Sequence, residues 1–136
     1  MIILFNKPFN VLSQFTDNNI QSHERNNLSN YISISNVYPA GRLDKDSEGL
    51  LILTDQGYLQ SRISDPKYKM EKTYWVQVEG TVTEGSLEKL SAGVILKDGI
   101  TSKAKVRKIN QPEQLWSRIP PIRERKSIPV QWLEII

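Results

Sequence analysis

Apolar and polar side chains alternate most regularly over residues 73–79. This pattern predicts a strand with Tyr74, Val76 and Val78 on one face. Shorter apolar runs predict further strands, at residues 2–6, 50–54, 94–96, 100–106 and 130–136. Residues 11–15 could continue the first of these strands, and the turn pair Asp98-Gly99 predicts a hairpin between the third and the fourth.

Helical spacing of apolar residues predicts three short helices, at residues 28–32, 58–64 and 84–92. Thr54 or Asp55 is expected to cap the second helix, and Thr83 the third, by accepting free backbone N–H groups. In the second helix three side chains are expected to point inward: Tyr58, Leu59 and Ile63. A polar turn is expected at residues 16–19. Strands and helices are mixed without strict βαβ order, which favours an α+β fold.

Size and composition are those of one soluble globular domain, with 136 residues of which 38% are hydrophobic and 24% charged. The absence of cysteine excludes disulfides, thiol nucleophiles and Cys-based zinc sites. The single histidine, His23, lies among polar residues and is expected to be a solvated surface side chain. There is no basic leader and no apolar run of membrane-spanning length, so we expect a cytoplasmic protein that does not bind a membrane.

Basic residues are concentrated near the end of the chain. Residues 1–100 hold 10 basic and 12 acidic side chains, whereas residues 101–136 hold 8 basic and 3 acidic ones. This asymmetry indicates a surface for a polyanion, although a merely soluble face would give the same charge balance.

A charged loop bounded by glycines precedes the strand predicted at residues 50–54. The loop, residues 41–49, reads GRLDKDSEG, and the strand ends in the turn signal Asp55-Gln-Gly57. A polar loop above a rigid strand is a common way to present a reactive side chain.

The acidic residues of this stretch make a calcium site the first alternative. Positions 1, 3, 5 and 12 of a calcium loop would be Asp44, Asp46, Glu48 and Asp55. The match fails because position 5 is Glu, position 12 is the short Asp, and Pro39 with Gly41 excludes an entering helix. We therefore expect no metal, and a solvated acidic turn is the remaining alternative to a reactive loop.

The words GRLD and GLLILTDQG resemble the catalytic motif of pseudouridine synthases, in the RsuA-like branch that modifies ribosomal RNA. Three further segments resemble the same family in the same order: Asn6-Lys-Pro8 with its strand, KTYWVQV at 72–78, and LSAGVILKDG at 90–99. The resemblance implies a mostly antiparallel mixed sheet with helices packed on it and a catalytic cleft. It also implies that residues 1–136 form a single catalytic domain, without an S4-type RNA-binding domain before it.

This resemblance implies an enzyme that isomerises a uridine already built into large-subunit ribosomal RNA, without metal or cofactor. The base is detached and rejoined through a carbon atom. The catalytic Asp of the family maps onto Asp44, which could act as nucleophile or as proton acceptor. The active-site tyrosine, which packs on the flipped base, maps onto Tyr74, whereas alternation alone favours an ordinary core tyrosine there. Arg42 is expected to contact phosphate or to brace the loop, and Asp46 and Glu48 are assigned to structure.

The basic final third offers candidate RNA contacts. Four prolines, at positions 112, 120, 121 and 129, exclude a long regular element, and Trp116 stands among cationic side chains. Guanidinium and aromatic groups together suit single-stranded nucleic acid. With the charged entry to the strand at 73–79, the predicted RNA-binding residues beyond Arg42 are Lys72, Arg118, Arg123, Arg125 and Lys126.

One feature departs from the family pattern. In relatives, the strand matching residues 132–136 continues into a glycine- and arginine-rich motif whose basic residue pairs with the catalytic carboxylate. The sequence therefore predicts a C-terminally incomplete domain. Without that basic residue, an Asp44 that is buried would be poorly ionised, because desolvation raises the pKa of a carboxyl group. The macromolecule that this chain binds is expected to be ribosomal RNA, and the chain is expected to be a monomer. The alternative is a non-catalytic RNA-binding fragment.

Overall fold

The computed structural model describes residues 1–17 and 26–136, which divide into two compact units, Met1–Met70 and Glu71–Ile136. His23 and part of the turn expected at 16–19 lie outside the described residues. That residues 1–136 form a single domain stays a prediction. Within the described part of the chain, no helix is long and apolar enough to cross a membrane.

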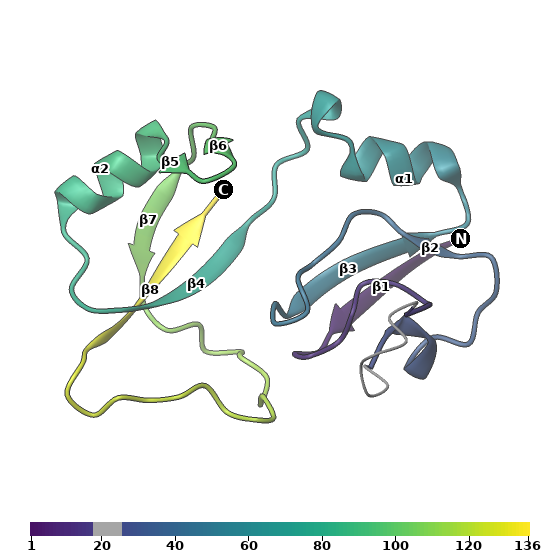
Figure 1. Cartoon of the computed structure of the whole chain (residues 1–136), viewed down its shortest axis with the longest axis horizontal. Coiled ribbons are helices and arrows are strands. Elements are labelled where there is room, and N and C mark those ends of the chain that lie inside the picture. Colours follow the sequence, from purple (N-terminus) through teal and green to yellow (C-terminus); the bar gives the residue numbers. More distant parts are fainter. Residues whose placement is uncertain (18–25) are drawn as a thin grey trace. The chain divides into compact units, whose positions relative to one another are not determined.

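The first unit is built on a three-stranded antiparallel sheet in the order β1-β3-β2 (Figure 1). Strand β1 (Ile2–Lys7) pairs along its whole length with β3 (Gly49–Thr54), and the short β2 (Tyr38–Pro39) covers the other edge of β3. Alternating residues turn one face of the sheet inward. The core there consists of Leu28, Val37, Leu51 and Leu53.

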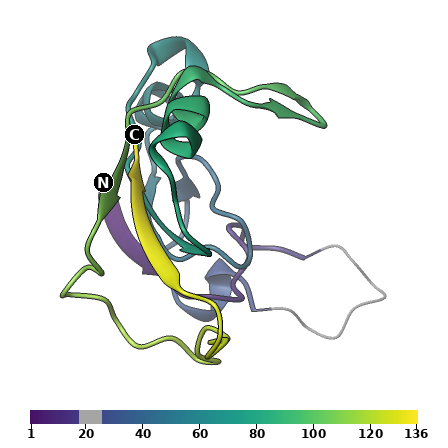
Figure 2. The same cartoon turned by 90° about the vertical axis from the view of Figure 1, so that its left-hand side faces the viewer.

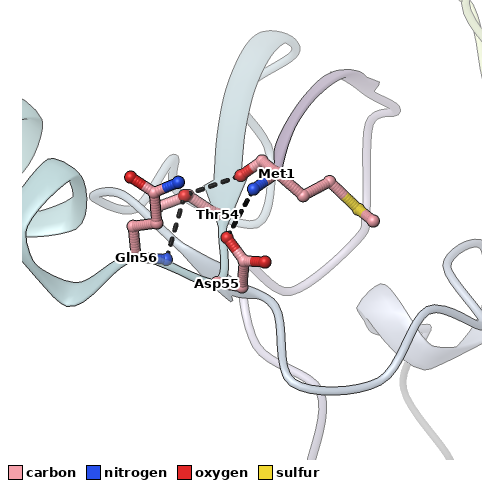
Figure 3. Close-up of polar contacts among 4 residues, drawn as sticks. All are labelled: Met1, Thr54, Asp55 and Gln56. Atoms are coloured by element: carbon pink, nitrogen blue, oxygen red, sulfur yellow. Dashed lines mark hydrogen bonds and ion pairs between the residues drawn. The ribbon is translucent and has the colours of Figure 1, made fainter.

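The end of β3 is fixed by polar contacts with the first residue of the chain (Figure 3). The Thr54 hydroxyl donates to the carbonyl of Met1 at 2.8 Å and accepts from the N–H of Gln56 at 3.1 Å. The Met1 amino group contacts Asp55 Oδ1 at 2.6 Å. The pKa of Asp55 is lowered, chiefly by the hydrogen bond from that amino group. The turn into the next helix therefore starts from a defined position.

The described residues of the first unit also form three short helices: η1 (Leu28–Asn30), α1 (Gly57–Ser64) and η2 (Pro66–Tyr68). Helix α1 ends at Ser64, the last residue of the predicted range, and Asp65 is its C-cap. The side chains of Thr54 and Asp55 do not cap it, because its N-cap is Gln56 and no side chain caps its first N–H groups. The inward position predicted for Tyr58 is also wrong, since this side chain is 66% exposed.

The second unit holds an antiparallel sheet in the order β4-β8-β7. Strand β8 (Val130–Ile135) lies between β4 (Tyr74–Glu79) and β7 (Val106–Ile109), and helix α2 (Glu84–Ala92) contacts β7. The hairpin of β5 (Ile95–Leu96) and β6 (Gly99–Ile100) extends away from this sheet (Figure 2). The Thr83 hydroxyl caps α2, as predicted, by accepting from Ser86 N at 3.2 Å.

The α+β class is confirmed, with antiparallel strand pairing in both units. Two strand predictions are wrong. Residues 11–15 form a single bridge, Leu12 to Asn27, because they turn away to pack against the loop at 41–49. The strand expected over 100–106 stops at Ile100, and β7 forms further along, where β8 supplies its partner.

Candidate active site

The loop at 41–49 connects β2 to β3, and glycines form both of its ends. Gly41 has φ +99° and Gly49 has φ +117°, backbone conformations that other residues rarely adopt. A Cβ on Gly41 would lie 3.8 Å from Cβ of Ser64, an ordinary contact, so the backbone conformation and not the available space requires glycine there. Helix α1 supports the entry to the loop, since Gln60 Nε2 donates to the carbonyl of Pro39 at 3.0 Å.

Lys7, at the end of β1, is fully buried beneath this loop. Its ammonium group donates to three backbone carbonyls: Val11 at 2.8 Å, Pro8 at 2.9 Å and Lys45 at 3.3 Å. Burial lowers the pKa of Lys7, and the nearby carboxylates of Glu48, Asp46 and Asp44 act in the opposite direction. Lys7 thus joins the first strand, the segment after it and the residue next to Asp44.

Ser13 fixes the loop from a second side. The Ser13 hydroxyl donates to the carbonyl of Leu43 at 2.7 Å, and Ser13 Oγ accepts from the N–H of Leu43 at 3.1 Å. Ser13 is only 3% exposed. Both polar backbone groups of the residue before Asp44 are therefore held by one buried hydroxyl.

Asp44 lies between these two anchors, and its side chain is exposed. Its backbone carbonyl accepts from the N–H of Ser47 at 3.1 Å, which closes a turn. No residue of the described chain forms a hydrogen bond or an ion pair with its carboxylate. The loop thus anchors the backbone of Asp44 and turns its side chain to solvent, so the case of a buried carboxyl does not arise here.

Arg42 braces the same loop. Its Nη2 donates to Oε1 of Gln14 at 2.7 Å, and the side chain is otherwise exposed. This bond agrees with one of the two roles expected for Arg42, bracing the loop. Contact with phosphate stays a prediction.

Tyr74 opens strand β4, opposite Ile135 of β8, and belongs to the second unit. The interpretation as a core tyrosine is wrong, because Tyr74 is 47% exposed at the beginning of its strand. Its ring is thus available to a ligand. Its pairing with Asp44 in one site, and the cleft between them, stay predictions.

The remaining predicted RNA contacts also lie in the second unit. Lys72, Arg123, Arg125 and Lys126 are exposed, and Arg118 is half-buried. Arg125 Nη1 lies 3.6 Å from Glu79 Oε2, which ties its segment to the end of β4. Trp116 is 46% exposed. Cationic groups and an aromatic ring are therefore open to solvent in this unit.

Sequence reasoning missed Lys7 and Ser13 as residues that position Asp44. Lys7 left a signal, because it falls in phase with the inward-facing Ile3 and Phe5 of β1, where a lysine is rarely tolerated without partners. Ser13 left none. Within residues 1–17 and 26–136, no three His, Cys, Asp or Glu residues come together in a way that could hold a metal ion.

A model of the RNA pseudouridylate synthase family matches residues 1–132. The chain belongs to this family. The match includes the anchored loop and both predicted catalytic residues, and it confirms the family that GRLD and its companion segments indicated. Within the family, the run at 116–129 resembles that of ribosomal large subunit pseudouridine synthase E.

Relatives with that name are similar over nearly the whole chain. The ribosomal large subunit pseudouridine synthase E of Vibrio vulnificus is 54% identical over 134 residues, which are 98% of this chain and 55% of the relative. The protein of the same name from Xanthomonas axonopodis is 50% identical over 99% of this chain and 70% of its own length. The Escherichia coli dual-specificity RNA pseudouridine synthase RluF is 38% identical over 79% of this chain and 36% of its own length. The chain thus spans about half the length of the Vibrio relative.

A solved structure supports the pseudouridine synthase fold. The crystal structure of a pseudouridylate synthase superposes with a TM-score of 0.72 and covers 98% of this chain and 49% of its own. Its sequence identity is 23%, so this likeness bears on the fold alone.

Proposed function

We propose that this chain carries the catalytic carboxylate of an RNA pseudouridine synthase that converts a uridine of large-subunit ribosomal RNA to pseudouridine. The observation that carries the proposal is the anchored loop of this family member, in which Asp44 is exposed while Lys7 and Ser13 hold the backbone on either side of it. The relatives named ribosomal large subunit pseudouridine synthase E support the choice of substrate.

The reaction is an isomerisation and balances without any co-reactant. The bond from the sugar to N1 of uracil breaks, a bond from the sugar to C5 forms, C5 loses its proton and N1 gains one. The uridine must first leave its stack, which costs least in loops. Asp44 would act at the sugar as nucleophile or at the base as proton acceptor, and both roles need a carboxylate that solvent and substrate can reach.

Tyr74 is proposed to support the flipped base. A ring that is nearly half exposed at the start of a strand can stack on a pyrimidine, and its hydroxyl could assist removal of the C5 proton. Arg42, Lys72, Arg118, Arg123, Arg125 and Lys126 would neutralise phosphates around this nucleotide.

Release of tritium from C5-labelled uridine in ribosomal RNA tests this function, since the isomerisation leaves the mass of the RNA unchanged. We expect release by the wild-type chain and none by Asp44→Asn, which keeps the size of the side chain and removes its charge. Release that continues in Asp44→Asn would refute the assigned role.

A non-catalytic RNA-binding domain is the second candidate, favoured by the exposed basic residues of the second unit. It predicts salt-dependent RNA binding without tritium release. Replacing Arg123, Arg125 and Lys126 by Gln would then lower the slope of log K against log salt by roughly 2. The absence of binding at low salt would exclude this candidate.

A further inference from the structure

Two tyrosines and an arginine form an exposed stack on the first unit, outside the candidate site. Arg62 Cζ lies 5.5 Å from the ring centroid of Tyr58 and 4.9 Å from that of Tyr68. Lys67 Nζ lies 4.9 Å from the Tyr68 ring. We call Tyr58, Arg62, Lys67 and Tyr68 the tyrosine–arginine surface.

Local sequence brings these four side chains together. Tyr58 and Arg62 are four residues apart in α1, so they lie on one face of the helix. The opposite face, which includes Gln60 and Ser64, packs toward β2 and Gly41. The tyrosine–arginine surface therefore occupies the solvent side of the helix that supports the catalytic loop.

The short helix η2 brings Tyr68 back beside Arg62. Asp65 caps η2 by accepting from the N–H of Lys67 at 3.0 Å, and Pro66 stands at its first position. Lys69 ends it with φ 51°. The turn is thus defined by local signals, and the Tyr68 ring is held against the guanidinium of Arg62.

The charge of this surface is positive and partly uncompensated. Residues 57–70 contain three basic side chains, Arg62, Lys67 and Lys69, and one acidic side chain, Asp65. Asp65 pairs with Lys67, whose Nζ lies 3.2 Å from Oδ2, and the pKa of Asp65 is lowered mainly by its hydrogen bonds to Lys67. Within the described residues no carboxylate pairs with Arg62.

We propose that the tyrosine–arginine surface binds unpaired nucleotides of the RNA substrate that flank the modified uridine. Tyr58 is 66% exposed and Tyr68 39% exposed, so their rings contribute little to the core and remain open to solvent. Exposed rings and a guanidinium plane are stacking partners for splayed bases, and Lys67 and Lys69 stand beside them for phosphates. The proposal rests on the proposed function only in taking RNA as the substrate.

Binding of a labelled single-stranded RNA, measured by fluorescence anisotropy, tests the surface. We expect Kd to rise about tenfold in the double variant Tyr58→Leu, Arg62→Gln, because stacking on one aromatic platform contributes about 1–3 kcal/mol per base. Arg62→Lys keeps the charge and loses the plane, so it should weaken binding less. In tritium release, KM should rise while kcat stays unchanged.

Tyr38→Leu is the matched control, because Tyr38 is 56% exposed on β2 of the same unit and has no cation above its ring in the described chain. An unchanged Kd in the double variant, with an unchanged melting temperature, would overturn the inference, as would an equal loss in Tyr38→Leu. If the wild-type chain neither binds RNA nor releases tritium, the proposed function is refuted, and this inference with it. If it does both and the double variant behaves as wild type, only this inference fails.

Discussion

Lys7 shows how a single buried charge can organise a reactive loop. Its three ammonium protons meet three backbone carbonyls, which satisfies a group that is expensive to bury. One of those carbonyls belongs to Lys45, the residue after Asp44. The contribution of Lys7 is therefore to position the loop and not to act on substrate.

Replacing Lys7 by methionine should lower the free energy of unfolding by about 1–3 kcal/mol, because the carbonyls it serves lose their donor. We also expect kcat to fall, since the loop beside Asp44 loses an anchor. Urea denaturation followed by tryptophan fluorescence measures the first effect, and tritium release the second. Lys45→Met is the control, because its backbone carbonyl stays in place. Equal stability of Lys7→Met and wild type would contradict this role.

Local signals account for those elements that sequence analysis predicted well. Helix α2 was placed correctly at Glu84–Ala92, because Thr83 provides a cap and Gly93 an end within a few residues. Strand β7 was missed, because its four residues are stabilised by β8, more than twenty positions further along the chain. Tyr58 was placed inward because periodicity counts a tyrosine as apolar, whereas here its ring packs under Arg62.

The glycines near the two ends of α2 allow a matched test of this element. A Cβ on Gly93 would lie 2.6 Å from the carbonyl oxygen of Thr101, and its φ is +106°. Gly93→Ala should therefore destabilise the chain by about 1–3 kcal/mol. A Cβ on Gly85, inside the helix, would meet no atom within 4 Å, so Gly85→Ala should stabilise by about 0.5–1 kcal/mol. Thermal unfolding measures the melting temperature of both variants. Changes of the same sign relative to wild type would contradict this account.

A cross-strand cluster joins the three strands of the second sheet. Glu134 of β8 accepts from Arg107 Nε of β7 at 2.6 Å and from Trp75 Nε1 of β4 at 3.2 Å. The hydrogen bond from Arg107, followed by that from Trp75, lowers the pKa of Glu134 below its ordinary value of 4.5. The carboxylate thus stays ionised between its two partners.

The stability contributed by Glu134 should depend on pH in a definite direction. Because the folded pKa lies below the unfolded one, the contribution is complete above about pH 4.5 and is lost as the pH falls through the folded pKa. Glu134→Gln should therefore be less stable than wild type near neutral pH, and the difference should shrink in acid. Urea denaturation over a pH series measures it, and a difference that stays constant with pH would contradict the cluster.

Across the chain as a whole, the residues proposed for catalysis and RNA binding are divided between the two units. The first holds Asp44 with its anchors and the tyrosine–arginine surface, and the second holds Tyr74 and the basic segment. Sequence resemblance could assign these residues to one reaction, because the segments that resemble the family are recognisable in the sequence itself. It could not show that Asp44 is exposed or what holds it, since those facts depend on contacts with the distant Lys7 and Ser13.

The central claim is that Asp44, and not another carboxylate of its loop, is the catalytic group. The most direct measurement compares single-turnover tritium release by Asp44→Asn and Asp46→Asn on the same C5-labelled ribosomal RNA, because both side chains are exposed and two residues apart. We expect Asp44→Asn to bind RNA as wild type does and to release no tritium, while Asp46→Asn retains release. Release by Asp44→Asn at the wild-type rate, or equal loss in both variants, would contradict the claim.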